Sequence, residues 1–179
     1  MTHTLTPNKT RRSLLLGGVA ASFLAACGQS SAEESVSSGA NSMNFADSEW
    51  RDISNADWKT RLDPAAYNVL RKAGTERPNS SPLNVEKRDG VFVCTACGLP
   101  LFRSTTKYES GTGWPSFYEP IEGALETKPD NTLFMRRTEY HCARCGSHQG
   151  HLFNDGPAPT GQRYCNNGVA LTFIADEGS

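Results

Sequence analysis

The sequence carries one short motif twice, first as Cys94-Thr95-Ala96-Cys97-Gly98 and again as Cys142-Ala143-Arg144-Cys145-Gly146. Both copies follow a strand-like run and end in glycine, so each is predicted to form a tight knuckle. Four thiolates from two knuckles match the tetrahedral coordination of a structural zinc ion. The 44 residues between the pairs, 98–141, exceed those of a compact zinc ribbon. One zinc ion would therefore join two distant parts of the domain.

Strand patterns surround the two motifs. Residues 88–90 read as a turn that leads into a strand over 91–93, and residues 99–102, 133–140 and 169–174 are also strand-like. We therefore expect a mainly β fold, an antiparallel β-sheet or barrel-like domain with the zinc site built into it.

Short helices are expected on the N-terminal side of these strands. Residues 49–62 show a helical pattern. A clearer helix follows, with Asp63 as its N-cap, Pro64 at its first position and Gly74 closing it. The polar, proline-containing segment 75–84 predicts an irregular connector to the strands.

The 179 residues suffice for one domain with extensions, and an apolar content of 37% with 21% charged residues is that of a globular protein. Residues 1–26 contain three basic and no acidic side chains, which leaves 15 basic against 19 acidic residues in the remainder, a net charge of −4. No nucleic-acid partner is expected for such a body. We expect a monomer.

Residues 1–26 read as an export signal. A basic region ending in Arg11 and Arg12 precedes the apolar run 14–26, which is too short to span a membrane and suits a signal peptide core. The basic region resembles a twin-arginine signal. Leu24-Ala25-Ala26-Cys27 resembles the bacterial lipobox, in which the cysteine becomes the lipidated first residue of the mature chain. The alternative is an ordinary soluble signal peptide.

A lipidated Cys27 would make this an exported lipoprotein, anchored at a membrane surface and facing the periplasm or the cell exterior. Residues 27–48 are rich in Ser, Ala, Gly and Asn and predict a flexible tether. Residues 49–179 would form the folded domain.

Export leaves a second fate open for the paired cysteines. An oxidising compartment allows the same four residues to form two disulfides. A two-residue spacing also serves redox exchange, although those motifs usually come singly. Twin-arginine substrates are understood to cross the membrane folded, so a metal acquired in the cytoplasm can survive export. We favour zinc.

Cys165 is the cysteine for which neither pairing nor lipidation gives a role. It lies in the stretch Gln162-Arg163-Tyr164-Cys165-Asn166-Asn167, among polar and charged neighbours. Such surroundings indicate a reactive thiol, and an inert buried thiol is the alternative.

Two further stretches are dense in chemically capable residues. Residues 110–117 read Ser-Gly-Thr-Gly-Trp-Pro-Ser-Phe, and residues 148–153 bring His148 and His151 within one short segment. Two glycines in the first stretch permit a backbone path closed to most residues, which fixes Trp114 beside a proline.

Together with the cysteine pairs, these stretches resemble the methionine sulfoxide reductase B family, the peptide-methionine (R)-S-oxide reductases. The resembling motifs are 110–117, 148–153 with the following Asp155-Gly156-Pro157, and 163–167, and the likeness runs over 58–173. The resemblance implies an antiparallel β fold and one structural zinc ion. It also implies a protein-repair enzyme of oxidative stress that reduces the R epimer of methionine sulfoxide, protein-bound or free.

Sulfoxide reduction requires a nucleophile for the electrophilic sulfur and an acid for the departing oxygen. Cys165 supplies the thiolate, which Arg163 favours electrostatically, and a sulfenic acid on this cysteine would be the product. His151 and His148 are the natural proton donors, because imidazole titrates near the working pH. Asn167 would orient a histidine or hold a water.

The reaction also needs an apolar seat for the S-methyl group, which Trp114 would form with support from Phe153. Several of these residues have a structural alternative. Trp114 and Phe153 would then pack in the core, His148 would be a structural histidine, and Arg163 would only pair with a surface acid.

Thr112 stands where many members of the family carry a second cysteine that resolves the sulfenic acid. The chain therefore predicts a one-cysteine cycle completed by an external thiol, a thioredoxin-like protein or a small reductant. Gln149, Asn166 and Asn79 also depart from the family pattern. Two alternatives to an enzyme are a zinc-stapled binding module and a redox sensor that stores the sulfenic acid.

Overall fold

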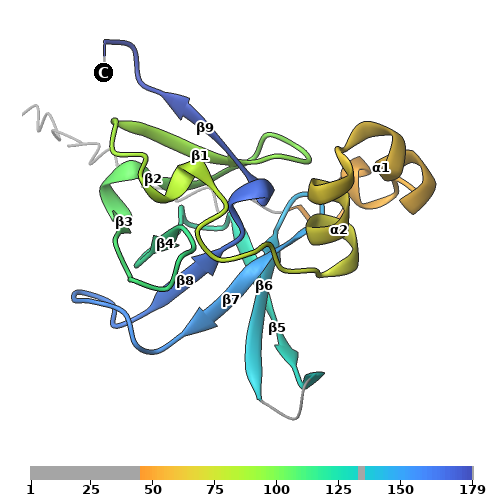
Figure 1. Ribbon diagram of the computed structural model, residues 1–179. Coiled ribbons are helices and arrows are strands. Elements are labelled where there is room, and N and C mark those ends of the chain that lie inside the picture. Colours follow the sequence, from red (N-terminus) through yellow and green to blue (C-terminus); the bar gives the residue numbers. More distant parts are fainter. Residues whose placement is uncertain (1–44, 133–135, 179) are drawn as a thin grey trace, which may run out of the picture. The chain divides into compact units, whose positions relative to one another are not determined.

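The computed structural model describes residues 45–132 and 136–178 (Figure 1). The predicted signal peptide 1–26, the predicted lipidation site Cys27, the tether as far as residue 44, and residues 133–135 of one predicted strand lie outside the described residues. Within the described residues, no helix has both the length and the apolar character needed to cross a membrane.

Two antiparallel sheets form the body of residues 45–178, which confirms the mainly β prediction (Figure 1). One sheet has the order β2-β1-β9, with β1 at Gly90–Cys94, β2 at Pro100–Arg103 and β9 at Leu171–Ala175. The other has the order β3-β4-β8-β7-β6-β5. Its strands are β3 (Lys107–Tyr108), β4 (Ser116–Phe117), β5 (Leu125–Asp130), β6 (Arg137–Cys142), β7 (His148–Phe153) and β8 (Arg163–Asn166).

Aromatic side chains join the two sheets. Phe102 on β2 stacks on Phe117 on β4 with ring centroids 4.1 Å apart, and Phe92 on β1 meets Phe117 edge-on at 5.0 Å. Tyr140 and Tyr164 from the six-stranded sheet also meet Phe102 edge-on. Since edge-to-face and offset-stacked pairs contribute beyond their buried area, this cluster fixes how the sheets pack.

The N-terminal helices are α1 (Asn55–Arg61) and α2 (Pro64–Lys72). The predicted N-cap Asp63 and first residue Pro64 of α2 are confirmed, although the Asp63 side chain makes no capping hydrogen bond. The predicted closure by Gly74 is wrong in detail, because Ala73 takes the left-handed conformation at φ 52°. Gly74 is needed for space instead, since a Cβ there would lie 2.3 Å from Asn68 Nδ2.

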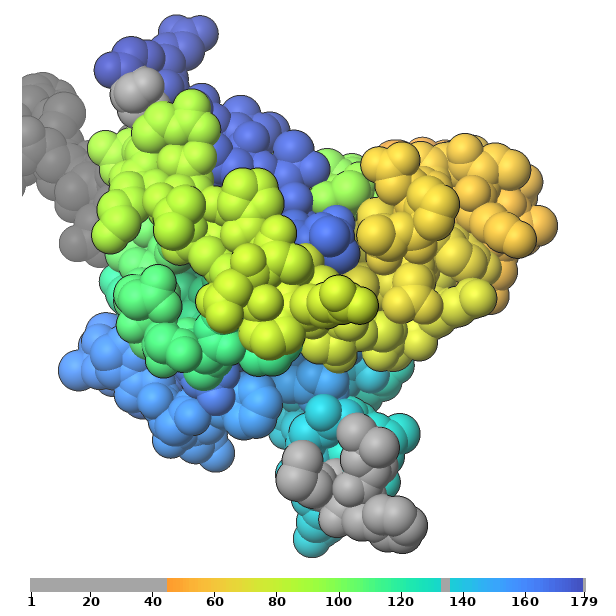
Figure 2. Space-filling model, viewed as in Figure 1, coloured from red at the N-terminus to blue at the C-terminus, as the bar shows by residue number. Residues whose placement is uncertain are grey.

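Short 3₁₀ turns complete the chain, and their bounds are Glu49–Arg51, Pro82–Asn84, Ser104–Thr106 and Gly168–Ala170. The connector 75–84 is irregular up to its terminal 3₁₀ turn, as predicted. In Figure 2 its yellow-green surface borders the green surface of the 110–117 stretch. Asn79 N and Asn84 Nδ2 both donate to the carbonyl of Gly113, at 2.7 and 2.9 Å. The connector and the glycine-rich stretch are therefore held together.

Four strands begin within a few residues of their predicted bounds, but β3, β4, β5, β7 and β8 are strands that the sequence patterns did not predict. The predicted strand 169–174 starts only at Leu171, because residues 168–170 form a 3₁₀ turn. In the strands that were missed, apolar and polar residues do not alternate clearly. One face of the six-stranded sheet, to which these strands contribute, carries polar and charged side chains.

That face is defined by the register of the six-stranded sheet. Directly opposed residues form one continuous row across all six strands, and because side chains alternate along a strand, the row lies on one face. The row consists of Tyr108, Ser116, Cys165, His151, Glu139 and Lys128. Strand pairing thus assembles ionisable groups that are far apart in the sequence.

Gly150 allows β7 and β8 to approach each other beside this row. A Cβ on Gly150 would lie 1.9 Å from the carbonyl oxygen of Cys165. Gly150→Ala is therefore expected to reduce the free energy of unfolding by about 3 kcal/mol, measured by denaturant titration, and to impair activity. The control is Gly161→Ala, where a Cβ meets nothing within 4 Å and only the left-handed φ of 69° costs about 1 kcal/mol. Equal losses in the two variants would contradict the steric argument.

Candidate active site

Cys165 lies at the wall of a pocket of about 160 Å³. Apolar rings and polar groups share its lining, which comprises Thr75, Trp114, Arg137, Gly150, His151, Phe153, Cys165, Asn166 and Asn167. The structure thus brings five residues predicted from the sequence into one pocket: Cys165, His151, Asn167, Trp114 and Phe153. Thr75 and Arg137 belong to the lining but were not predicted.

The surroundings of the Cys165 thiol act on its ionisation in opposite directions. Burial raises its pKa, while the positive charge of Arg163 and hydrogen bonds from Thr112 and Arg163 favour the thiolate. Burial is the largest effect, so the net pKa is raised. Burial therefore favours the neutral thiol, whereas the hydrogen-bond donors lower its pKa and increase the fraction of the nucleophilic thiolate.

Arg163 lies beside the pocket and is fixed from two sides. Its Nε and Nη2 donate to Asp155 at 2.8 and 2.9 Å, and its guanidinium lies 4.2 Å above the centre of the Phe153 ring. Arg163 is almost completely buried, so this is more than the surface ion pair considered above. Phe153 lines the pocket, as predicted, and its ring also supports the arginine, a contact that was not predicted.

His151 is bound to a carboxylate that the sequence analysis missed. Its Nε2 lies 2.8 Å from Asp130 Oδ2, and Arg137 donates to the same oxygen at 2.7 Å. Hydrogen bonds from Thr132 and His151 hold the pKa of Asp130 well below its usual range, so this carboxylate stays ionised. Asp130 sits in a polar stretch with no motif around it, and only the pairing of β5 with β6 brings it near His151.

His148 lies behind His151 and is not among the residues that line the pocket. The two rings meet edge-on with centroids 5.5 Å apart, and His148 Nδ1 lies 3.1 Å from Glu139 Oε1. Burial lowers the pKa of His148, and Glu139 opposes that effect. Burial raises the pKa of Glu139, but contacts with His148 and Lys128 outweigh it and the net pKa is lowered. His148 is thus placed to support the ring of His151.

Asn167 and Trp114 are both anchored by the backbone of Glu76. Trp114 Nε1 donates to the Glu76 carbonyl at 3.2 Å, and the Glu76 N–H donates to Asn167 Oδ1 at 3.0 Å. The Asn167 amide also donates to the carbonyl of Gln149 at 2.9 Å. Asn167 therefore ties the connector to β7, and its role in orienting a histidine or a water stays a prediction.

The Glu76 carboxylate in turn accepts hydrogen bonds from Gly168 N at 2.5 Å and from Val169 N at 3.1 Å. Glu76→Ala removes both acceptors at a part-buried position, so we expect a loss of about 2 kcal/mol in the free energy of unfolding. The carboxylate also fixes the position of the Glu76 backbone groups that bond Trp114 and Asn167, so its loss should loosen both side chains and lower kcat/KM about tenfold. Steady-state kinetics and denaturant unfolding measure the two effects. Glu122→Ala, an exposed glutamate in a loop, is the matched control and should change neither. Unaltered kinetics in Glu76→Ala would refute the anchoring role.

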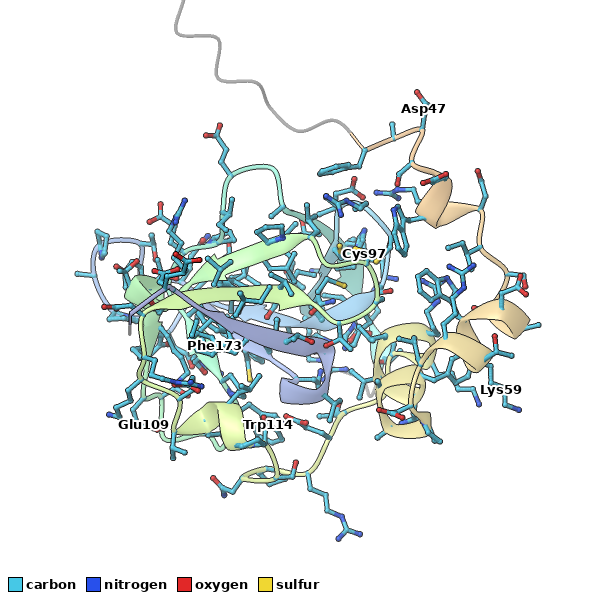
Figure 3. The ribbon with its side chains drawn as sticks, turned by 90° about the horizontal axis from the view of Figure 1, so that it is seen from above. Asp47, Lys59, Cys97, Glu109, Trp114 and Phe173 are labelled. Carbon is cyan, nitrogen blue, oxygen red and sulfur yellow. The ribbon has the colours of Figure 1, made fainter. Side chains whose placement is uncertain are left out.

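The four paired cysteines converge as predicted. Their Sγ atoms all lie within 4.8 Å of one another and all four residues are buried. Each knuckle closes with an identical hydrogen bond of 2.8 Å, from Gly98 N to Cys94 O and from Gly146 N to Cys142 O. Both glycines take positive φ, at 72° and 68°, as such knuckles require. Figure 3 shows the sulfur atoms gathered beside Cys97.

These distances suit a metal and not disulfides. The closest pairs are Cys97 with Cys142 at 3.5 Å and Cys94 with Cys145 at 3.8 Å, and all four thiols are free. A tetrahedron of zinc–sulfur bonds of about 2.3 Å separates its sulfurs by about 3.8 Å, whereas a disulfide bond is about 2.05 Å long. Cys94, Cys97, Cys142 and Cys145 therefore form a structural zinc site, which joins the end of β1 to the end of β6.

The residues that depart from the family pattern have defined partners. Gln149 is fully buried and its Nε2 donates to Cys94 Sγ at 3.3 Å, so it supports the zinc site. Asn166 Oδ1 accepts from Tyr140 Oη at 2.8 Å. Asn79 takes a left-handed φ of 61°, which asparagine tolerates better than phenylalanine. The structure thus accommodates Asn166 and Asn79, whereas Gln149 Oε1 is buried without a hydrogen-bond partner among the described residues.

Comparisons with known proteins agree with this site. Residues 62–175 match the SelR domain family. The chain is 55% identical over 125 residues to "Peptide methionine sulfoxide reductase MsrB" of Methanosarcina mazei, an alignment that covers 69% of this chain and 89% of that protein. The proteins of the same name from Alteromonas mediterranea and Pseudomonas entomophila are 50% and 56% identical, over 70% and 64% of this chain and 89% and 88% of theirs. The chain therefore belongs to the methionine sulfoxide reductase B family of oxidoreductases.

Proposed function

We propose that this protein reduces the R epimer of methionine sulfoxide, carried by oxidised proteins or peptides, to methionine through a sulfenic acid on Cys165. The observation that carries the proposal is the Cys165 thiol at the wall of a pocket with apolar rings and a carboxylate-bound histidine. One thiol and one sulfoxide give one sulfenic acid and one thioether, so the sulfoxide oxygen passes to the Cys165 sulfur.

The residues divide this reaction between them. Trp114 and Phe153 offer the apolar walls that an S-methyl group needs. The Cys165 thiolate attacks the sulfoxide sulfur, and His151, held by Asp130, delivers a proton to the oxygen. Arg163 stabilises the thiolate before the attack. His148 acts through His151, because it does not line the pocket.

Regeneration of Cys165 requires a thiol from outside the chain. The zinc site engages four cysteines, the proposed lipidation consumes Cys27, and Thr112 offers no thiol. An external thiol attacks the sulfenic acid, which forms a mixed disulfide and releases water, and a second thiol then releases Cys165 as the free thiol. A thioredoxin-like protein is the partner that the proposal names.

The proposal includes the place of the enzyme. The twin-arginine pattern and the lipobox around Cys27 support export, lipidation and anchoring at a membrane surface that faces the periplasm or the cell exterior. The substrates would then be exported proteins damaged by oxidants. Mass spectrometry of the mature protein, showing a diacylglycerol-modified cysteine at its N-terminus, tests this part.

The function is tested by supplying each methionine sulfoxide epimer separately, in a peptide, with dithiothreitol as reductant. We expect turnover of the R epimer and none of the S epimer. Reduction of neither epimer, or of the S epimer alone, would refute the proposal. A redox sensor would instead react faster with hydrogen peroxide than with either sulfoxide.

The one-cysteine cycle predicts what happens after a single turnover without reductant. Mass analysis of the natural chain should show a Cys165 sulfenic acid and no intramolecular disulfide. Because the Thr112 side chain is one of the groups that act to lower the pKa of Cys165, a thiol at this position should lie within reach of the sulfenic acid. Thr112→Cys should therefore convert nearly all of this product to a disulfide between Cys165 and the introduced thiol. The control is Thr105→Cys, at an exposed position in a neighbouring turn, which should leave the sulfenic acid in place. A disulfide between Cys165 and a zinc-site cysteine in the natural chain would contradict the cycle.

A further inference from the structure

Three hydroxyl groups form a hydrogen-bonded chain beside Cys165. The oxygens of Ser110 and Ser116 are 2.8 Å apart, and those of Ser110 and Thr112 are also 2.8 Å apart. At one end of the hydroxyl chain, the Thr112 side chain favours the Cys165 thiolate and so acts to lower the pKa of the thiol. At the opposite end, Ser116 Oγ donates to the Trp114 carbonyl oxygen at 3.1 Å. The chain therefore connects the nucleophile to a main-chain acceptor through three residues to which the proposed function assigns no role.

The strands and the glycine-rich stretch fix this chain in place. Ser116 is fully buried and stands directly opposite Cys165 in the pairing of β4 with β8. Ser110 and Thr112 belong to the short loop before β4, and Thr112 N also points at Ser110 Oγ, at 3.5 Å. Ser116 is buried and Ser110 and Thr112 are half-buried, so the hydrogen bonds among them are partly shielded from water.

The number of available protons determines how the hydrogen bonds among the three hydroxyls are directed before and after Cys165 ionises. Each hydroxyl has one proton to donate. With a neutral thiol, four protons serve four links: Cys165 donates to Thr112, each hydroxyl donates to the next, and Ser116 donates to the Trp114 carbonyl. With a thiolate, three protons remain. The three links among Cys165, Thr112, Ser110 and Ser116 then reverse: Ser116 donates to Ser110, Ser110 to Thr112 and Thr112 to the sulfur. Only the Trp114 carbonyl then loses its donor.

We propose that Thr112, Ser110 and Ser116 form a switchable hydroxyl relay that stabilises the Cys165 thiolate, with Thr112 as the group that touches the sulfur. Reversal needs only rotation of three C–O bonds and no movement of the backbone. The relay works without a second thiol. Thr112, which occupies the position of the resolving cysteine of many family members, instead supplies a hydrogen-bond donor to the nucleophile. The inference rests on the proposed function only in taking Cys165 as the reactive group.

The relay opposes the burial that raises the pKa of Cys165. A hydrogen bond to a charged group is worth enough to move a pKa by about one to two units. Thr112→Val keeps the shape of the side chain and removes the hydroxyl, so it should raise the thiol pKa by that amount. Thr112→Ser keeps the hydroxyl and should restore the natural value. Ser116→Ala shortens the relay and should raise the pKa by less than Thr112→Val does.

The test is the pH dependence of alkylation of Cys165 by iodoacetamide in the full chain, followed by mass spectrometry of the peptide that contains Cys165. This peptide distinguishes Cys165 from the zinc-site cysteines. Thr105→Val removes the hydroxyl of an exposed threonine and should not move the profile. Zinc content and circular dichroism are compared with those of the natural chain, so a folding defect is recognised and Thr112→Ser then decides.

An unchanged pKa in Thr112→Val, or a raised one in Thr112→Ser, would overturn the contact with the sulfur. A shift in Thr112→Val without any shift in Ser116→Ala would overturn the relay as a connected unit. The outcome is independent of the enzymatic assay: a protein that reduces neither sulfoxide epimer but shows these shifts refutes the proposed function and supports the relay. Sulfoxide reduction with unshifted profiles does the reverse.

Discussion

Cys165→Ser is expected to reduce sulfoxide reduction at least about a thousandfold, because a serine hydroxyl is not ionised at neutral pH and is a poor nucleophile toward sulfur. The substitution replaces sulfur with oxygen and keeps the side chain nearly the same size. The half-buried, polar setting of Cys165, with Thr112 and Arg163 as donors, accepts a hydroxyl without leaving an unpaired group. The loss should therefore appear in kcat and not in stability.

Steady-state kinetics with the R epimer and dithiothreitol measure this effect. The variant should keep its zinc content and the denaturant midpoint of the natural chain, which separates a chemical defect from a folding defect. Residual activity above a tenth of the natural rate would show that another group carries the reaction. The nearest groups, His151 and Arg163, offer no alternative sulfur, so that result would refute the mechanism as a whole.

Loss of the zinc site is the second change with a large expected effect. Cys142→Ala removes a buried ligand at the end of β6, and β7 with His151 begins only six residues later. Binding of a structural zinc contributes on the order of 10 kcal/mol in small zinc domains, and a domain is stable by only about 5–15 kcal/mol. We expect the variant to lose the metal, to unfold at least partly at room temperature, and to lose activity with its structure.

Metal analysis together with far-ultraviolet circular dichroism checks this prediction, and a strong chelator applied to the natural chain should reproduce the effect. Thr95→Ala is the matched control, since Thr95 lies inside the first knuckle but contributes only a hydrogen bond to Thr172 on the surface. Its stability should change by less than about 1 kcal/mol. A metal-free protein that keeps the natural unfolding midpoint would show that the knuckles hold without zinc.

Much of the fold could be predicted because its signals are local. A proline after an aspartate starts α2, and a glycine after each cysteine pair closes a knuckle at positive φ. Apolar strands such as β1 can be recognised in the sequence by their valine and phenylalanine residues. Strands β5, β7 and β8 could not be recognised in this way, because one face of each contributes to the polar face of the six-stranded sheet and carries polar groups in place of packing residues.

The candidate reactive groups could be predicted from the sequence alone: the thiol of Cys165, the imidazole of His151, the indole of Trp114 and the four zinc ligands. Each is marked by residue type and by its immediate neighbours, which are local properties. The side chains that surround these groups could not be predicted, because they come from other strands. Asp130 reaches His151 and Ser116 reaches Cys165 through strand register, since pairing of strands sets contacts between residues that no sequence spacing relates. The loop before β4 carries Thr112, which favours the thiolate of Cys165 although it lacks the thiol that many family members have there.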